Sequence, residues 1–283
     1  MSPAGGSHDF GSGIRSICET TPSNNVIIEH CASYGNGVDT SSTASGPGIW
    51  LDHAGTGNIV RYNISYGNES GGSSAGIGIY LEALGTSSAV KAYYNISYGN
   101  EIGIMLSRET HDCEIYNNVS YNNTVANFNV LGSWGGGDAQ GMEDNVIKNN
   151  ISLPGPNAAS AFGALYGGDN DGVDGDRNIY LNNCWGAEGA GFIVWGFGVT
   201  KAMYDDWETA YGATTSSVEA DPLMTDPASD DFTLQPGSPC RERGAVTGLT
   251  ADYNGDLVPQ GVTDIGAYEY APQSGALFFG CNF

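Results

Sequence analysis

Residues 58–65 read NIVRYNIS and are followed by YGN, and residues 90–97 read VKAYYNIS and are again followed by YGN. Four more segments match the same pattern, namely VIIEHCAS at 26–33, CEIYNNVS at 113–120, NVIKNNIS at 145–152 and NIYLNNCW at 178–185. The serines that close the first four copies along the chain are 32, 32 and 23 residues apart. Such self-similarity predicts a stack of like units, each too short to bury its own apolar face without its neighbours.

One column of these segments is almost entirely asparagine. Its members are Cys31, Asn63, Asn95, Asn118, Asn150 and Asn183. We expect this column at a tight turn between two strands, because Asn tolerates the left-handed conformation and stacked side-chain amides hydrogen-bond from unit to unit. Four of the asparagines also stand in Asn-x-Ser sequences, which N-glycosylation uses. We favour the amide ladder, since a buried turn amide is not an exposed acceptor for a glycan.

These repeats and the short β-rich runs within them resemble the right-handed parallel β-helix superfamily of pectate-lyase-like proteins over about residues 13–185. The resemblance implies an all-β fold, a single-stranded right-handed parallel β-helix (solenoid), with the asparagine column between the second and third strands of each coil. The superfamily contains lyases, glycoside hydrolases, epimerases and phage tailspikes. The resemblance is therefore specific for the fold but not for one reaction.

The charge balance limits the partners of the protein. With 32 acidic against 9 basic residues, the net charge of the 283-residue chain is −23. We expect neither nucleic acid nor an anionic membrane as partner, and a polyanionic substrate would need calcium or local basic residues. No apolar run reaches the roughly 18 residues of a membrane-spanning helix. A polysaccharide or oligosaccharide is the partner that fits, and the oligomeric state stays open.

The resemblance to the β-helix superfamily implies that two similar phrases, GIWLDHAG and GIYLEALG, lie in the first strand of consecutive coils. Because side chains alternate along a strand, Trp50 and Asp52 face outward in one coil, and Tyr80 and Glu82 face outward in the next. Neighbouring strands lie about 4.8 Å apart, so we expect the two carboxylates side by side in solvent. Carboxyl groups about 5–5.5 Å apart are typical of retaining glycosidases, and aromatic rings beside them are platforms for sugar rings.

The two phrases also resemble, over about forty residues, the catalytic region of β-helix glycosidases such as the family 120 xylosidases. That resemblance implies Asp52 as catalytic nucleophile and Glu82 as acid/base. His53 and Arg108 lie at the ends of the same coils and are candidates to bind substrate or to orient a carboxylate. Two other interpretations stay open, namely acidic residues that only keep a solvated face soluble, and a calcium site.

A second candidate site is the acidic loop GGDNDGVDGDRN. Its carboxylates are Asp169, Asp171, Asp174 and Asp176. Oxygen-rich, flexible loops suit calcium, although the spacing departs from that of an EF-hand. We keep two interpretations, a structural calcium site and a plain acidic loop. The expected hydrolytic chemistry itself requires no cofactor.

Two further functions compete with hydrolysis. A calcium-dependent polysaccharide lyase or epimerase needs cations that neutralise a uronate carboxylate. Near the aromatic residues the sequence offers Arg61, Lys91 and Arg108, and the repeat alignment puts the first two on the second strand, facing elsewhere. The other function is a non-catalytic glycan-binding or adhesive stack, which the same aromatic column would serve.

The last part of the chain lacks the repeat. Residues 216–283 include DFTLQPGSPC and GVTDIGAYEY and resemble the closing segment of many secreted bacterial β-helix proteins. The resemblance implies terminal coils and a C-terminal cap in the same domain as the coils of residues 1–215, and a secreted or cell-surface protein. The opening MSPAGGSHDF lacks the pattern of a signal peptide. The six cysteines lack metal-ligand spacing and are expected either to pair in an oxidising compartment or to be buried small side chains.

Overall fold

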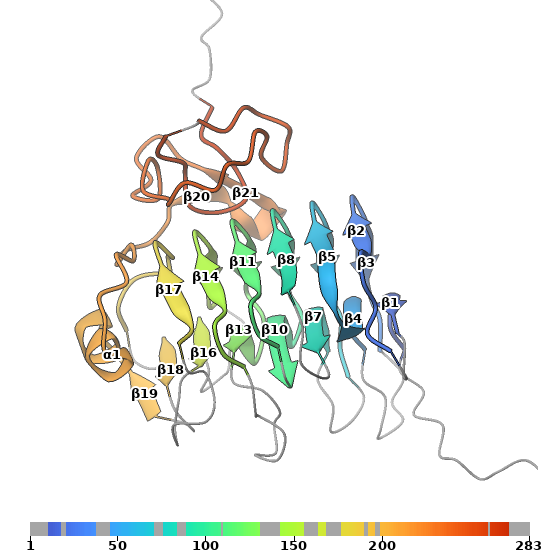
Figure 1. Ribbon diagram of the computed structural model, residues 1–283. Helices are drawn as coiled ribbons and strands as arrows, with labels where there is room; N and C mark the ends of the chain where they lie inside the picture. Colours follow the sequence, from blue (N-terminus) through green and yellow to red (C-terminus); the bar gives the residue numbers. More distant parts are fainter. Residues whose placement is uncertain are drawn as a thin grey trace, which may run out of the picture.

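The structure, a computed structural model, is a stack of coils along one axis (Figure 1). From β1 to β18 successive strands of the chain fall in different sheets, and neighbours within the long sheets are almost all parallel. The fold is therefore the all-β parallel β-helix that the repeats predict. The structure describes residues 11–17, 21–37, 46–70, 76–83, 89–108, 110–130, 142–155, 164–167, 177–189, 192–195, 199–259 and 261–271, except for the side chain of Arg108.

Sheet A contains the first strand of each coil, and all of its pairs are parallel except the last, β18 with β19. In spatial order its members are β1 (Ile14–Ser16), β4 (Ile49–Ala54), β7 (Ile77–Ala83), β10 (Ile102–Arg108), β13 (Ala126–Val130), β16 (Leu165–Gly167), β18 (Ile193–Trp195) and β19 (Val199–Lys201). The phrases GIWLD and GIYLE fall in β4 and β7, which confirms them as first-strand segments.

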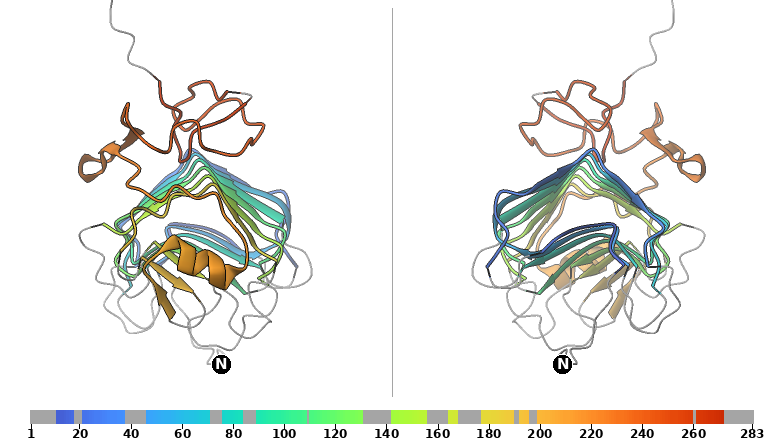
Figure 2. Two further views of the ribbon diagram at one scale, coloured as in Figure 1. Left: turned by 90° about the vertical axis from the view of Figure 1, so that its left-hand side faces the viewer. Right: turned by 90° about the vertical axis from the view of Figure 1, so that its right-hand side faces the viewer.

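Sheets B and C contain the second and third strands and meet at a ridge opposite sheet A, as the end-on views show (Figure 2). Sheet B consists of β2 (Ile27–Glu29), β5 (Thr56–Arg61), β8 (Ala89–Tyr93), β11 (Glu114–Tyr116), β14 (Val146–Lys148) and β17 (Ile179–Leu181). Sheet C consists of β3 (Ala32–Tyr34), β6 (Ile64–Tyr66), β9 (Ile96–Tyr98), β12 (Val119–Tyr121) and β15 (Ile151–Leu153).

The core lies between the three sheets and is built from the inward side of each strand. In sheet A the register pairs Ile49 with Ile79 and Leu51 with Leu81, and all four side chains are fully buried. Burial of apolar surface stabilises the stack by about 25 cal/mol per Å². Because side chains alternate, the residues between these positions point out of the stack.

The asparagine column forms the expected amide ladder at the turn between sheets B and C. From coil to coil each Nδ2 donates to the next Oδ1, with distances of 3.0, 3.0, 2.9 and 3.0 Å along Asn63, Asn95, Asn118, Asn150 and Asn183. The same Oδ1 atoms also accept backbone N–H groups. All of these side chains are fully buried, which confirms the ladder in preference to glycosylation.

One detail of that turn differs from our expectation. The left-handed residue is the one before the ladder asparagine, so that Tyr62 and Tyr94 have φ values of 54° and 51°. The same conformation occurs at His30, Asn117, Asn149 and Asn182. The ladder residue has to keep its side chain inside the stack, so the unfavourable conformation falls on its outward-facing neighbour.

A second asparagine ladder, which we did not predict, explains the SYGN phrase. At the turn between sheets C and A it joins Asn36, Asn68, Asn100, Asn123 and Asn127. Within SYGN, Asn68 Nδ2 donates to Ser65 Oγ at 3.1 Å, and that hydroxyl donates to Gly78 O at 2.7 Å. A Cβ on Gly48 would collide with the Ser65 hydroxyl, so the glycine that opens the GI phrase is required by this packing.

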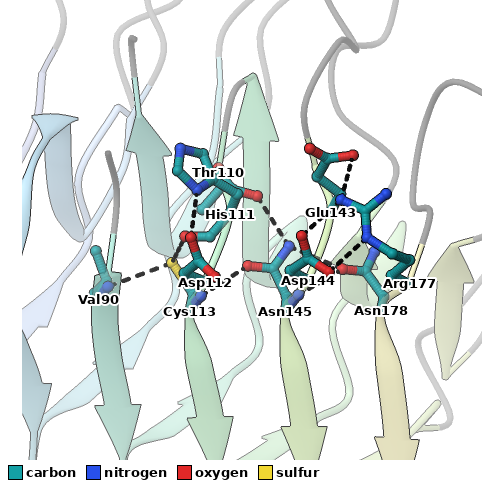
Figure 3. Close-up of polar contacts among 10 residues, drawn as sticks. All are labelled: Val90, Thr110, His111, Asp112, Cys113, Glu143, Asp144, Asn145, Arg177 and Asn178. Carbon is teal, nitrogen blue, oxygen red and sulfur yellow. Dashed lines mark hydrogen bonds and ion pairs between the residues drawn. The ribbon is translucent and has the colours of Figure 1, made fainter. Parts of the chain in front are cut away.

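A third column runs along the turn between sheets A and B (Figure 3). Asn145 and Asn178 form ordinary rungs, with Asn145 Nδ2 donating to Asn178 Oδ1 at 3.0 Å. In the preceding coil Cys113 takes the place of an asparagine. Its N–H donates to Asn145 Oδ1 at 3.0 Å, and its Sγ accepts the N–H of Val90 at 3.4 Å. Cys113 is thus a buried structural thiol.

Helix α1 (Tyr204–Tyr211) lies across the far end of the stack (Figure 2). Its Trp207 is fully buried and contacts the rings of Trp185 and Tyr180 edge to face. This aromatic plug replaces a further coil and shields the apolar end of the stack from water. Repeat reasoning did not predict the helix, because eight residues are too few for a helical period to stand out. No helix in the described ranges has the length and apolar composition needed to cross a bilayer.

The tail, residues 216–271 of the described chain, lies along the side of the stack. We expected further coils at the end, whereas this segment runs back over the ridge between sheets B and C (Figures 1 and 2). Asn149 Nδ2 donates to Ala245 O at 2.7 Å, and Asn117 Nδ2 donates to Gly266 O at 3.0 Å. The reason is that the ridge offers outward amides and apolar side chains that need cover. The described part of the tail contains two strands, β20 (Met224–Asp226) and β21 (Asp231–Leu234), joined by a 3₁₀ turn, η1 (Pro227–Ser229). These two strands pair only with each other.

Candidate active site

The aromatic residues of the first strands line up on the outward side of sheet A. The register places Trp50 of β4 beside Tyr80 of β7, and Tyr80 beside Met105 of β10. The Trp50 and Tyr80 rings stack with centroids 5.3 Å apart and 17° between their planes. The column that repeat spacing and side-chain alternation predict is therefore confirmed.

A β-bulge sets the position of the acidic residues. The register shifts after the Leu51–Leu81 pair, so that Asp52 and His53 together lie opposite Glu82. His53 takes the left-handed conformation, with φ of 57°. Bulges of this kind re-aim side chains and are frequent next to active sites. The bulge leaves Asp52 on the outward side of sheet A, beside Glu82.

Asp52 is held by two basic side chains. Arg15 of β1 donates from Nε to Asp52 Oδ2 at 3.1 Å, and its Nη2 contacts the same oxygen. The Nδ1 atom of His53 contacts the other oxygen, Oδ1. Hydrogen bonds to a charged partner are shorter and stronger than neutral ones, and they fix the orientation of the carboxylate. His53 therefore acts on Asp52, the second of the two roles that we considered for it.

Arg15 is the candidate residue that sequence reasoning missed. It occupies the register position of Trp50 in the first coil, and its guanidinium lies 4.0 Å from the centre of the Trp50 ring. A signal for it was present, because Gly13–Ser16 reads GIRS, a further copy of the phrase that begins GIWL and GIYL. Alignment on the GI pair alone would have placed Arg15 in the outward column.

The ring of Trp50 has neighbours on both faces. Arg15 lies over the ring and Tyr80 stacks with it, and the indole Nε1 donates to Glu82 Oε2 at 2.9 Å. Trp50 is only 5% exposed. The ring faces that we expected to meet a sugar are thus occupied by protein. Tyr80 is half-buried, and its hydroxyl accepts a hydrogen bond from Ser107 Oγ at 2.9 Å.

Both carboxylates are buried, whereas we expected them to face solvent. Asp52 is 3% exposed and Glu82 is 2% exposed. The contacts with Arg15, His53 and Trp50 account for part of this cover. Alternation along a strand predicts which side a residue faces, but not what covers that side. The burial excludes the interpretation in which these acids only keep a solvated face soluble.

The described residues do not favour a calcium site at the carboxylate pair. The oxygens of Asp52 are occupied by Arg15 and His53, and no group of three or more His, Cys, Asp or Glu in the described ranges is arranged to hold a metal ion. The acidic loop stays a prediction for structural calcium. All four of its carboxylates lie outside the described residues, namely Asp169, Asp171, Asp174 and Asp176.

The other basic residues of the sequence prediction do not converge on the pair. Arg61 and Lys91 belong to sheet B, as the repeat alignment predicts. There they form ion pairs with Glu29 at 2.6 Å and with Glu114 at 2.7 Å. Arg108 ends β10, but its side chain lies outside the described part of the structure. Its role in binding substrate stays a prediction.

No protein-family profile matches the chain, and no curated protein matches it significantly. Among solved structures the chain is similar to pectate lyase Pel9A, with a TM-score of 0.32 and 11% sequence identity over 93% of this chain and 86% of that one. A likeness this distant does not bear on the reaction or the substrate.

Proposed function

We propose that the protein is an extracellular or cell-surface glycoside hydrolase that cleaves a plant or microbial polysaccharide, with Asp52 as nucleophile and Glu82 as acid/base. The observation that carries the proposal is the pair itself, two nearly fully buried carboxylates side by side on neighbouring strands. Burying an acid costs several kcal/mol unless its surroundings compensate. Buried acids with specific charged partners occur preferentially at functional sites.

The surroundings support different roles for the two acids. Asp52 faces the guanidinium of Arg15 and the imidazole of His53, and these contacts fix the orientation of its carboxylate, as an attacking nucleophile requires. Glu82 accepts the indole N–H of Trp50 in a buried position. Burial favours the neutral form of a carboxyl group, and a general acid needs that form. Two neighbouring acids in contrasting environments are the usual basis for assigning a nucleophile and an acid.

In the proposed reaction Asp52 attacks the anomeric carbon while Glu82 gives its proton to the departing glycosidic oxygen, which leaves a glycosyl ester on Asp52. Glu82 then takes a proton from water, and the water displaces Asp52 with net retention of configuration. Arg15 keeps the carboxylate of Asp52 oriented. Because both acids are buried, the outward side of sheet A has to open before a sugar ring reaches them.

A neutral polysaccharide fits better than a polymer of uronates. The net charge of −23 repels a polyanion. Arg15 is already bound to Asp52, and Arg61 and Lys91 lie on another face. A calcium-dependent lyase or epimerase is therefore the weaker alternative, because it needs cations for the uronate carboxylate. A non-catalytic glycan-binding or adhesive stack is the other alternative.

An activity screen on neutral and uronate polysaccharides tests the proposal. We expect new reducing ends without unsaturated products, and rates at least about 100-fold lower in Asp52→Asn and in Glu82→Gln. The matched control is Glu114→Gln, which removes an acidic charge from sheet B and should keep the wild-type rate. Products that absorb in the near ultraviolet would establish a lyase instead. Glycan binding by a wild-type protein that cleaves nothing would establish a binding module.

A further inference from the structure

Cys184 lies at the end of the ladder between sheets B and C. Its N–H donates to Asn150 O at 2.8 Å, and its carbonyl accepts the N–H of Ser152 at 2.9 Å. These bonds hold Cys184 against β15, and its side chain is fully buried. The position of this thiol is therefore fixed by the stack itself.

Cys240 belongs to the tail that covers the ridge. Its N–H donates to Ser238 Oγ at 3.1 Å, and its carbonyl accepts the N–H of Ile265 at 3.0 Å. The next residue, Gly266, donates its N–H to Asn149 O of the stack at 2.8 Å. Cys240 is fully buried. The tail therefore holds this thiol on the surface of the stack rather than in solvent.

Residues 220–222 of the tail contact the surroundings of both Cys184 and Cys240. Ala220 O accepts a hydrogen bond from Cys184 Sγ at 3.3 Å. Pro222 O accepts one from Ser238 Oγ, the hydroxyl that also binds the N–H of Cys240. The two cysteines belong to one apolar cluster. The pKa of the Cys240 thiol is raised, mainly by its contact with the Cys184 thiol and secondarily by burial. Both thiols are free in this structure, and their shared cluster and common contact with residues 220–222 place them close together.

We propose that Cys184 and Cys240 form a disulfide bond that fastens the tail to the last coils of the stack. The co-reactant is a small disulfide oxidant. One protein thiolate attacks it to form a mixed disulfide, and the other protein thiolate then displaces the second small thiol. One S–S bond forms as another breaks, and the oxidant leaves as two thiols carrying both protons and both electrons. Because both sulfurs are buried, the bond forms while the tail docks during folding.

Cys113 provides a matched control for this pair. It is equally buried, but its Sγ bonds to the N–H of Val90 at 3.4 Å and to His111 O at 3.5 Å, on the turn between sheets A and B. The inference concerns the scaffold. It stands whether or not the proposed hydrolase activity is found.

Peptide mapping of the full chain tests the bond. The protein is refolded with glutathione and glutathione disulfide and is then denatured, so that N-ethylmaleimide reaches and blocks every free thiol. After the denaturant is diluted, trypsin is added without reductant. Trypsin releases one peptide of residues 178–201, whose only cysteine is Cys184, and one of residues 202–241, whose only cysteine is Cys240. A cross-link between these two peptides therefore identifies the bond. We expect that pair to dominate and Cys113 to carry the blocking group.

Thermal melting supplies the second readout. Reduction should lower the melting temperature of the wild type and of Cys113→Ser by several degrees, and should leave Cys240→Ser unchanged. A folded, oxidised wild type with blocking groups on both Cys184 and Cys240, or with either one linked to another cysteine, would overturn the proposal. The map is read on the wild type, so the answer does not depend on how well a variant folds.

Discussion

The indole N–H of Trp50 donates a hydrogen bond of 2.9 Å to the carboxylate of Glu82 on the following coil. Trp50 is itself in contact with Arg15 over its ring and with Tyr80 in the stack, so the donor cannot move without disturbing both neighbours. Glu82 is therefore oriented by the aromatic column. This gives Trp50 a positioning role that differs from the sugar platform expected from the sequence.

Replacing Trp50 with Phe tests this link. The variant keeps an aromatic ring for stacking but removes the indole donor of Glu82. A buried acceptor that loses its donor costs about 1–3 kcal/mol, and we expect urea titration to show a loss of unfolding free energy of about that size. The control is Tyr80→Phe, which loses the hydroxyl bonded to Ser107 and should cost about 1 kcal/mol. Equal losses in the two variants would contradict a special role for the indole.

Arg15→Met removes the charge that faces Asp52 and keeps an unbranched apolar chain over Trp50. Breaking a buried ion pair costs about 3–5 kcal/mol, and we expect a value near the lower limit because the Arg15 side chain is 25% exposed. Urea denaturation measures the loss. Arg61→Met breaks the more exposed pair with Glu29 and should cost about 1 kcal/mol or less. Similar losses in the two variants would mean that Asp52 does not depend on Arg15.

The amide ladder predicts a large cost for the loss of one rung. In Asn118→Ala the N–H and the Nδ2 of Asn95 lose the oxygen that accepts both of them. Each buried polar group left unsatisfied costs about 1–3 kcal/mol, so we expect a loss of about 2–6 kcal/mol in thermal or urea unfolding. Asn36→Ala, on the partly exposed first coil, should lose clearly less. The ladder account fails if the two substitutions are equally harmful.

The tail carries an acid whose protonation changes stability. Burial, followed by the charge of Asp264, raises the pKa of Glu269 from its usual 4.5 to about 7. The folded protein thus binds this proton more tightly than the unfolded chain. Its stabilisation is complete below the unfolded value of 4.5 and is lost as the pH rises through about 7. Burial also raises the pKa of Asp252, which acts in the same direction.

We therefore expect the melting temperature of the wild type to fall as the pH rises from about 5 to about 8. Glu269→Gln cannot ionise and should flatten this part of the profile. A calorimetric series at constant ionic strength measures both proteins. If the wild type and Glu269→Gln show the same slope, the pH dependence has another origin.

Much of the scaffold could be predicted from the sequence because a stacked fold repeats its own contacts. The asparagine column identified the turn, and Asn118 lies in the ladder as its spacing requires. The outward pairing of Trp50 with Tyr80 followed from the two-residue period of a strand. In both cases the neighbour of a residue is another copy of the same phrase, so a local pattern fixes a contact between distant residues.

The rest depends on contacts that no repeat encodes. Side-chain propensities do not decide which of two adjacent residues takes the left-handed conformation, and here Tyr62 takes it instead of Asn63. The burial of Asp52 and the part of Arg15 in holding it depend on what packs over an outward face. Helix α1 and the path of the tail along the ridge are single features, and a period carries no information about them.

The central claim is that Asp52 forms a covalent bond to the sugar during hydrolysis. A 2-fluoro analogue of the glycoside identified by the activity screen should slow the second step and trap the glycosyl ester. After trypsin digestion of the trapped protein, the peptide of residues 16–61 is read by fragment mass spectrometry. The account predicts the sugar mass on Asp52 in the wild type and no adduct in Asp52→Asn. Rapid turnover with the adduct on any other residue would contradict it.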